Sequence, residues 1–380
     1  MPRLTSLSLT IPDYKYRFRH DTARITLLRA LLPALSSSLE QLVVSLDVAP
    51  LRDMAALPWP RLRSLTLRGA DPPVEDEMPL FITHLLAAMP GLRSFSLLQA
   101  QAWNSDHHVM WPTGQSGDFP CAQLERLEIS YPNPADEVYS RLPDTLRQLS
   151  LRCWPRHYLR QHRYERKTLK RRLKWRSPIL KSSELLTILR RCRSDLLEVL
   201  EIEYREDSED ARLLRSLSEL FPALHTLTVF RYRCEPTNTD VPVESIAQAL
   251  STLRHLRILR IHLDFPNAPH PLSPFRTYPW HAEFDAFDDF LHEPARTLAT
   301  RLNSSVQYVC LLRRQYWRSE WLPFRIVRDT RGGGRASDVK EIRLDDGLVS
   351  IGDIIMEDDP PPYTKDQIPP GPDFIDDFEF

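Results

Sequence analysis

Leu-Glu-Arg-Leu-Glu-Ile-Ser-Tyr-Pro-Asn, at residues 124–133, is the stretch that decides the fold of this chain. Its apolar residues are Leu124, Leu127 and Ile129, and charged or polar residues stand between them. Alternation with period two predicts a strand with one buried face. Many copies of such a strand along one chain are typical of a solenoid, because each unit is too small to bury its apolar face without a neighbour.

The pattern apolar-x-x-apolar-x-apolar recurs along almost the whole chain. Its nine clear copies begin at Leu4, Leu39, Leu62, Leu92, Leu124, Leu146, Leu197, Leu224 and Leu256, and weaker copies begin at Val306 and Val339. The spacing between successive copies varies from 22 to 51 residues. We therefore expect stacked strands whose curvature is uneven.

The segments between the copies predict helices. Leu213, Leu217 and Leu220 mark one face at helical spacing, after a serine at position 208 that is suited to cap the helix. Apolar residues on both sides of Pro294 predict another helix around that proline. Several of the expected helices end at a proline that precedes the next strand, namely Pro33, Pro90 and Pro222. The order helix, proline, strand predicts an α/β chain.

The strands resemble leucine-rich repeats, and the order helix, proline, strand resembles the irregular repeats of fungal F-box leucine-rich-repeat proteins. The resemblance covers roughly residues 4–312 and implies a curved solenoid with a parallel sheet on the concave side and helices on the convex side. The asparagine or cysteine of the repeat consensus is well placed only at Asn133. Aspartates are expected to replace it elsewhere, at Asp13, Asp47, Asp71 and Asp264. No three-helix F-box is recognisable before or after the repeats.

The expected domain organisation has three parts. Residues 1–315 form the leucine-rich-repeat solenoid, with a basic insertion at 152–181. Residues 316–356 form a C-terminal capping segment, which hides the apolar face of the last repeat. Residues 357–380 form an acidic, proline-rich tail that is expected to be disordered.

The formal net charge of -1 conceals two opposed blocks. Residues 152–176 carry eleven Lys or Arg and one acidic residue, whereas residues 338–380 carry thirteen acidic residues and three basic ones. The basic block has three interpretations: a solvated insertion, a nuclear import signal, or a nucleic-acid-binding segment. The charges also predict that it attracts the acidic tail. Its candidate residues are Lys167, Lys170, Arg171, Arg172, Lys174 and Arg176.

Charged side chains stand between the apolar residues of the strands and should face the concave surface. A concave sheet with mixed charges is suited to bind a peptide or protein, and the alternative is an ordinary solvated surface. The candidates are Arg68, Arg126, Glu128, Arg152, Glu201, Glu203, Arg260 and His262.

The acidic tail contains a Pro-Pro-x-Tyr sequence, the kind of ligand that WW domains bind. It is formed by Pro360, Pro361 and Tyr363. Because the chain has 33 prolines, a chance match is the alternative.

Motifs for catalysis and metal binding were not recognised. The five cysteines are scattered and never form a Cys-x-x-Cys pair, which favours reduced thiols over a zinc site or a disulfide framework. We found no His-Glu-x-x-His, no Gly-x-Ser-x-Gly and no phosphate-binding loop. The sequence therefore predicts no enzyme, cofactor or metal, and no apolar run suggests a membrane span.

These observations predict a non-enzymatic protein-interaction scaffold, located in the cytoplasm or the nucleus. The resemblance implies the substrate-recognition part of an F-box ubiquitin ligase receptor. Its partner would be an unknown substrate protein, joined by a ubiquitin-ligase adaptor if a longer isoform carries an F-box. The alternative is a nuclear, nucleic-acid-associated protein that uses residues 152–176, although we do not expect nucleic acid to be the main partner.

Overall fold

The computed structural model describes most of the repeat region and part of the C-terminal segment. The described residues are 4–9, 22–69, 78–99, 109–154, 156–157, 179–192, 194–235, 240–269, 280–314, 319–328 and 336–341. Strands and helices alternate over much of this length. The strands are β1 (Ser6–Leu9), β2 (Gln41–Ser45), β3 (Ser64–Gly69), β4 (Ser94–Gln99), β5 (Arg126–Ser130), β6 (Gln148–Arg152), β7 (Val199–Arg205), β8 (Thr226–Tyr232), β9 (Ile258–His262), β10 (Tyr308–Arg314), β11 (Ser319–Arg328) and β12 (Ala336–Glu341).

The helices lie between successive strands. The α-helices are α1 (Thr22–Leu35), α2 (Leu51–Ala56), α3 (Met78–Ala87), α5 (Ser182–Leu189), α6 (Asp210–Leu220), α7 (Val243–Leu250) and α8 (Trp280–Arg301). The described residues also form short 3-10 helices: η2 (Leu46–Val48) precedes α2 in the connection from β2 to β3, and η3 (Glu137–Ser140) lies between β5 and β6.

All twelve strands belong to one sheet, and they follow one another in chain order. Strands β1 to β10 are parallel. The copies of the sequence pattern are in register, since Leu127 of β5 pairs with Phe95 of β4 on one side and Leu149 of β6 on the other. The prediction of an α/β chain with a parallel sheet is confirmed for β1 to β10.

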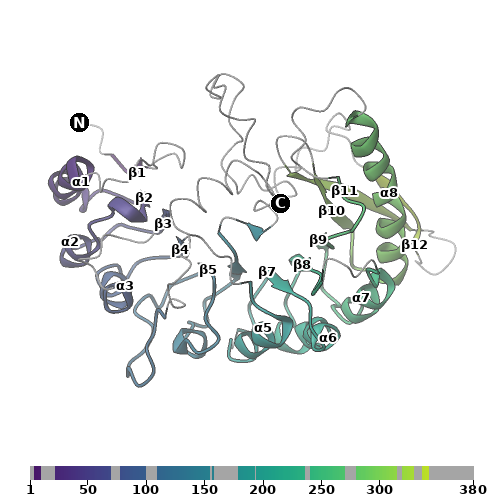
Figure 1. Ribbon diagram of the computed structural model, residues 1–380. Helices are drawn as coiled ribbons and strands as arrows, with labels where there is room; N and C mark the ends of the chain where they lie inside the picture. Colours follow the sequence, from purple (N-terminus) through teal and green to yellow (C-terminus); the bar gives the residue numbers. More distant parts are fainter. Residues whose placement is uncertain are drawn as a thin grey trace.

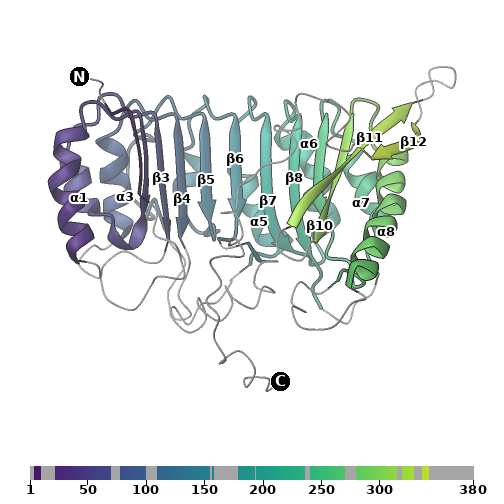
Figure 2. The ribbon, with the colours of Figure 1, turned by 90° about the horizontal axis from the view of Figure 1, so that it is seen from above.

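The sheet and the helices form two layers. Figure 1 shows the strands along the inner side of an open arc and the helices along its outer side, and Figure 2 looks onto the inner face of the sheet. The main hydrophobic core lies between the layers, where alternate strand residues such as Leu127 and Ile129 meet helix residues such as Leu213 and Leu217. Burial at about 25 cal/mol per Å² of apolar surface drives this stacking.

The C-terminal end departs from the repeat. Strand β11 pairs antiparallel with β10, and β12 pairs antiparallel with β11. The expectation of a further repeat strand at Val339 is therefore wrong, because Val339 lies in the antiparallel β12. Before these strands, the helix expected around Pro294 is present as α8, which runs through the proline.

Two of the three prolines expected to end helices do follow them. Helix α3 ends at Ala87, shortly before Pro90, and α6 ends at Leu220, shortly before Pro222. Pro33 instead lies inside the last turn of α1, which continues to Leu35. A proline there removes one backbone N–H from the final turn without stopping it.

Candidate functional site

The inner face of the sheet is divided into three zones along the arc. Because side chains alternate along a strand, the residues between the core positions face inward. The first zone, on β2 to β4, carries hydroxyl groups, the middle zone on β5 to β7 is charged, and the last zone on β8 to β11 is aromatic and apolar. Their central members are, in order, Ser45, Thr66 and Ser96; Glu128, Arg152, Glu201 and Glu203; and Phe230, Tyr232, Cys310, Leu312 and Trp321.

In the middle zone, a guanidinium pairs with the carboxylate of the neighbouring strand. Nε of Arg152 lies 2.6 Å from Oε1 of Glu128, and the Arg152 side chain is only 2% exposed. The hydroxyl of Ser96, on the strand at the other side, donates to Oε2 of Glu128 over 2.6 Å. Three adjacent strands, β4 to β6, thus share one partly buried polar contact.

A second guanidinium reaches the zone from a turn rather than from a strand. After β6 the chain forms what we call the inner turn (Cys153, Trp154, Arg156 and His157). The Arg156 side chain places Nη2 at 2.5 Å from Oε1 of Glu201 and Nη1 at 3.6 Å from Oε2 of Glu203. Its Cζ lies 4.4 Å from the centre of the Phe230 ring. Arg156 is therefore held by two carboxylates and an aromatic face, which is a favourable arrangement for a buried guanidinium.

Glu201 is held in its ionised form. Burial raises the pKa of a carboxyl, but Arg156 and Arg152, together with the Ser150 hydroxyl at 2.7 Å, outweigh burial and hold the pKa of Glu201 below its usual value. Removing either arginine therefore weakens the stabilisation of this charge.

Glu203 fastens the inner turn to the sheet. Its carboxylate accepts hydrogen bonds from the backbone N–H groups of Cys153 and His157, both at 2.8 Å. It also accepts one from the hydroxyl of Tyr232 at 2.9 Å. Complete burial raises the pKa of Glu203, and the charge of Arg156 and these hydrogen bonds oppose the rise. One carboxylate thus anchors both the turn and a neighbouring strand.

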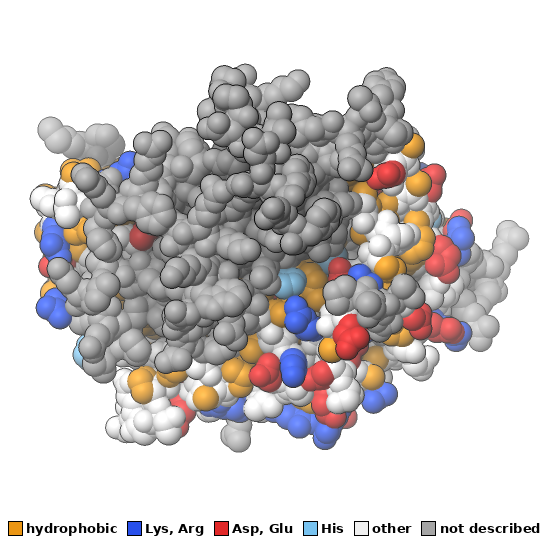
Figure 3. Space-filling view, viewed as in Figure 1, with side chains coloured by type: hydrophobic (Ala, Val, Ile, Leu, Met, Phe, Trp, Pro, Cys, Tyr) orange, Lys and Arg blue, Asp and Glu red, His pale blue; other side chains and the backbone are white. Residues whose placement is uncertain are grey.

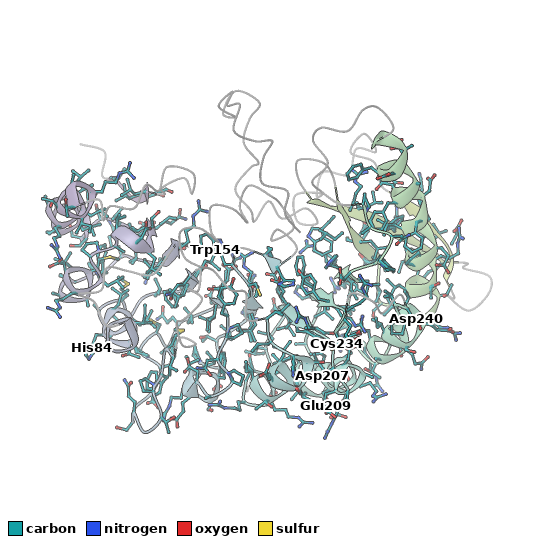
Figure 4. The ribbon with its side chains drawn as sticks, viewed as in Figure 1. His84, Trp154, Asp207, Glu209, Cys234 and Asp240 are labelled. Carbon is teal, nitrogen blue, oxygen red and sulfur yellow. The ribbon has the colours of Figure 1, made fainter. Side chains whose placement is uncertain are left out.

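Aromatic rings continue the site toward β11. The Tyr232 ring centroid lies 4.6 Å from that of His157 and 5.2 Å from that of His262, in edge-to-face arrangements. The Phe230 ring lies 5.4 Å from Trp321. Figure 4 labels Trp154, which lies on the inner side of the arc, and Trp154 forms a small apolar cluster with Leu98.

The structure places the eight predicted inner-face residues on the side of the sheet opposite the core, and it brings four of them together. Glu128, Arg152, Glu201 and Glu203 share the middle zone. His262 and Arg260 lie on β9, and both are buried. The other two lie apart: Arg68 is half-buried near the end of β3, and Arg126 is exposed at the start of β5.

Sequence reasoning missed Arg156, Phe230 and Tyr232 as site residues. Arg156 was hidden within the basic block, and nothing in the repeat pattern shows that it turns back onto the sheet. The aromatic pair does carry a signal, because Phe230 and Tyr232 stand two apart in the inward positions of β8. The same alternation that identified the charged residues would have found them.

The basic block contributes to the fold through its first cations. Arg152 and Arg156 are both engaged with carboxylates of the sheet, so they are not available to phosphates. Lys167, Lys170, Arg171, Arg172, Lys174 and Arg176 lie outside the described residues. So do the Pro-Pro-x-Tyr residues Pro360, Pro361 and Tyr363, the acidic tail, and Asp13 and Asp71.

Aspartates at the ends of strands do take part in local structure. Asp264 follows β9 with a φ of 47°, in the left-handed region, and its carboxylate lies 3.4 Å from Nε of Arg233. Aspartate tolerates this conformation better than most residues. Asp47 packs closely against Gly69. A Cβ on residue 69 would lie 3.0 Å from Oδ1 of Asp47, so the close approach favours glycine there.

A separate buried charged cluster lies on the core side of the sheet. Arg231 alternates with Phe230 along β8 and faces the helices, where its Nε lies 2.9 Å from Oδ2 of Asp210 and its other contact is Glu206. The Tyr204 hydroxyl donates to Asp210 over 2.8 Å. This cluster fixes the start of α6 against β7 and β8, so we assign it a structural role.

Asp207 joins the starts of two helices at the edge where the strands end. It accepts hydrogen bonds from the Ser182 hydroxyl at 2.7 Å, the Ser183 hydroxyl at 2.5 Å and the backbone N–H of Glu209 at 2.9 Å. Figure 4 shows Asp207 and Glu209 beside α5 and α6, and in Figure 3 side chains of both charges lie next to one another over these helices.

Three buried cysteines have thiols of low reactivity. Burial raises the pKa of Cys121, Cys192 and Cys310 to about 12, so these thiols stay protonated at neutral pH. Across the described residues, no three His, Cys, Asp or Glu side chains are grouped as a metal ion requires. None of the described helices is both long and apolar enough to cross a membrane.

Comparisons with known proteins give no family for this chain. No family model and no curated protein matches the sequence. Among solved structures, the chain is similar to the leucine-rich repeat-containing protein LegL7 from Legionella pneumophila, at 14% identity and a TM-score of 0.40, over 81% of this chain and 90% of that chain. A TM-score of this size does not show a common fold, so function is inferred from this chain's own residues.

Proposed function

We propose that this protein is a non-enzymatic, leucine-rich-repeat-type scaffold that binds a protein partner on the inner face of its sheet. The observation that carries the proposal is the middle zone, where paired arginine and glutamate side chains adjoin the aromatic residues of β8. Arginine and aromatic side chains at the centre of a surface are characteristic of protein interfaces. The partner would first meet the more accessible residues of the inner face, exposed Arg126 and half-buried Arg68.

The test is affinity capture with charge-reversed variants. We expect Arg68→Glu with Arg126→Glu to lose proteins that the wild type retains, because reversing two charges on the inner face disrupts electrostatic complementarity with a partner bound there. The matched control is Arg215→Glu, since Arg215 is also exposed but lies on α6, at the outer side of the arc. Equal capture by all three proteins would contradict binding at the inner face.

A finer proposal concerns the class of scaffold. The resemblance of the repeats to those of F-box proteins supports a role as a substrate receptor of a ubiquitin ligase, in the cytoplasm or nucleus. It is tested by mixing this chain with a purified cullin-RING adaptor. Because no F-box is recognisable in the sequence, we expect no complex with this chain alone, and a complex would reveal an unrecognised adaptor site.

A further inference from the structure

We propose that Glu201, Glu203 and Phe230 form a pocket for a guanidinium group, that Arg156 fills it within the chain, and that an arginine of the protein partner takes its place on binding. This deepens the proposed function and rests on it for the identity of the partner. The pocket itself is testable without any partner.

The geometry around Arg156 is that of arginine recognition. Two carboxylates lie along one edge of the guanidinium, at 2.5 Å from Glu201 and 3.6 Å from Glu203, and the Phe230 ring lies against its face at 4.4 Å. A planar guanidinium satisfies both kinds of contact at once, whereas a lysine ammonium is a compact charge without a flat face. The pocket is therefore specific for guanidinium over ammonium.

The origin of Arg156 distinguishes it from the other arginine of the zone. Arg152 belongs to β6, where its backbone is paired with the adjacent strand β5, and its side chain pairs with Glu128 of that strand. Arg156 belongs to the inner turn. The backbone of that turn is bonded to the sheet through Glu203, which also faces the guanidinium. A competing guanidinium at Glu203 would thus weaken the contact of Glu203 with the Arg156 side chain. It would also weaken the hydrogen bonds that hold the inner turn to the sheet.

The charge of the zone also favours a cationic ligand. Its three carboxylates, Glu128, Glu201 and Glu203, face the two guanidinium groups of Arg152 and Arg156. If Arg156 left without a replacement, buried carboxylates would lose their nearest cation, which is strongly destabilising. An arginine from a partner restores the pairing, so exchange is favoured over simple opening.

The pocket is tested by chemical rescue of Arg156→Ala. We expect ethylguanidinium, at about ten times its Kd, to raise the Tm of this variant by roughly 2 °C. Ethylammonium should raise it less, and neither probe should stabilise the wild type. Arg147→Ala is the matched control, because Arg147, just before β6, pairs with Glu198, just before β7, over 2.6 Å at an exposed position. If Arg156→Ala does not fold, its refolding yield with and without ethylguanidinium, and the Tm of Arg156→Gln, give the same readout. Equal responses to the two probes, or none, would overturn the pocket.

The exchange is tested on the wild type with two tripeptides, acetyl-Gly-Arg-Gly-amide and the same peptide with citrulline. Release of the inner turn would expose Trp154, so we expect the arginine peptide to shift tryptophan fluorescence to the red. The citrulline peptide should not, and Trp154→Phe should lose the shift. Arg156→Gln should bind the arginine peptide at least about ten-fold more tightly than the wild type, since its internal competitor is gone. Equal affinities would overturn the exchange while leaving inner-face binding to be judged by its own capture experiment.

Discussion

The Arg152 guanidinium lies 2.6 Å from the Glu128 carboxylate on the inner face of the sheet, and the arginine side chain is buried. A few residues earlier, Arg147 makes an equally short contact with Glu198 where both side chains are exposed. The two pairs have the same chemistry and differ in their access to water. They therefore separate the effect of burial from that of pairing.

We expect Arg152→Ala to lower the free energy of unfolding by about 3–5 kcal/mol, because Glu128 keeps a partly buried charge without its partner. Arg147→Ala should lower it by no more than about 1 kcal/mol, since water replaces the lost contact. Urea titrations of both variants measure the difference. Similar losses would show that the inner face is as solvated as the outer edge of the strands.

Strand β5 shows how far the sequence predicts this structure, because it has core positions and inner-face positions in alternation. Leu127 and Ile129 were recognisable from their spacing, because every repeat must bury the same side of its strand. Val309 continued this pattern correctly into β10. Val339 did not, because the chain reverses after β10 and a short apolar pattern carries no information about strand direction.

The site was predictable only in part, for a similar reason. Period-two alternation placed Glu201 and Glu203 on the inner face. It did not show that Arg156 neutralises them, because that contact depends on how the inner turn folds. The sequence also did not predict that the middle zone is buried. A strand pattern shows which side of the sheet a side chain points to, but not which other segment covers it.

The alternation itself predicts opposite outcomes for neighbouring residues. Leu127→Ala should lower the free energy of unfolding by about 2–5 kcal/mol, because it leaves a cavity in the main core. Arg126→Ala should change it by less than about 0.5 kcal/mol, since its side chain is exposed. Thermal unfolding of the two variants measures this. Comparable effects would contradict the register of β5.

The loss of folding stability at acidic pH should depend on Glu201. Its pKa is lowered in the folded protein from the usual 4.5, so ionised Glu201 stabilises the fold above pH 4.5 and this contribution is lost as pH falls through the folded pKa. Glu201→Gln should therefore lose less stability than the wild type on acidification below pH 4.5. Parallel curves for the two proteins would rule out this linkage.

Glu203 should show the opposite dependence. Its pKa is raised above 4.5, so its contribution to stability is present below pH 4.5 and is lost as pH rises through the folded pKa. We expect Glu203→Gln to lack that decline when unfolding by urea is followed on the alkaline side of pH 4.5. A steeper decline in the variant would mean that the hydrogen bonds from the inner turn outweigh burial.

Asp207 should stabilise two helices at once. Burial tends to raise its pKa, but hydrogen bonds from Ser183 and Ser182 outweigh burial and hold the pKa below its usual value. We expect Asp207→Ala to lower the free energy of unfolding by about 1–2 kcal/mol through lost capping. Hydrogen exchange should accelerate in both α5 and α6. Glu209→Ala is the control. Glu209 lies at the start of α6 only, so amide hydrogen exchange in α5 should stay slow in this variant.

The central claim, that a protein partner binds the inner face, is tested most directly by photo-crosslinking in cells. A photoreactive amino acid is placed at position 126, on the inner face, or at position 215, on the outer side of α6. We predict a discrete adduct from position 126 that Glu203→Gln weakens, and no such adduct from position 215. Adducts from position 215 alone would contradict the claim and place the binding surface on the helices.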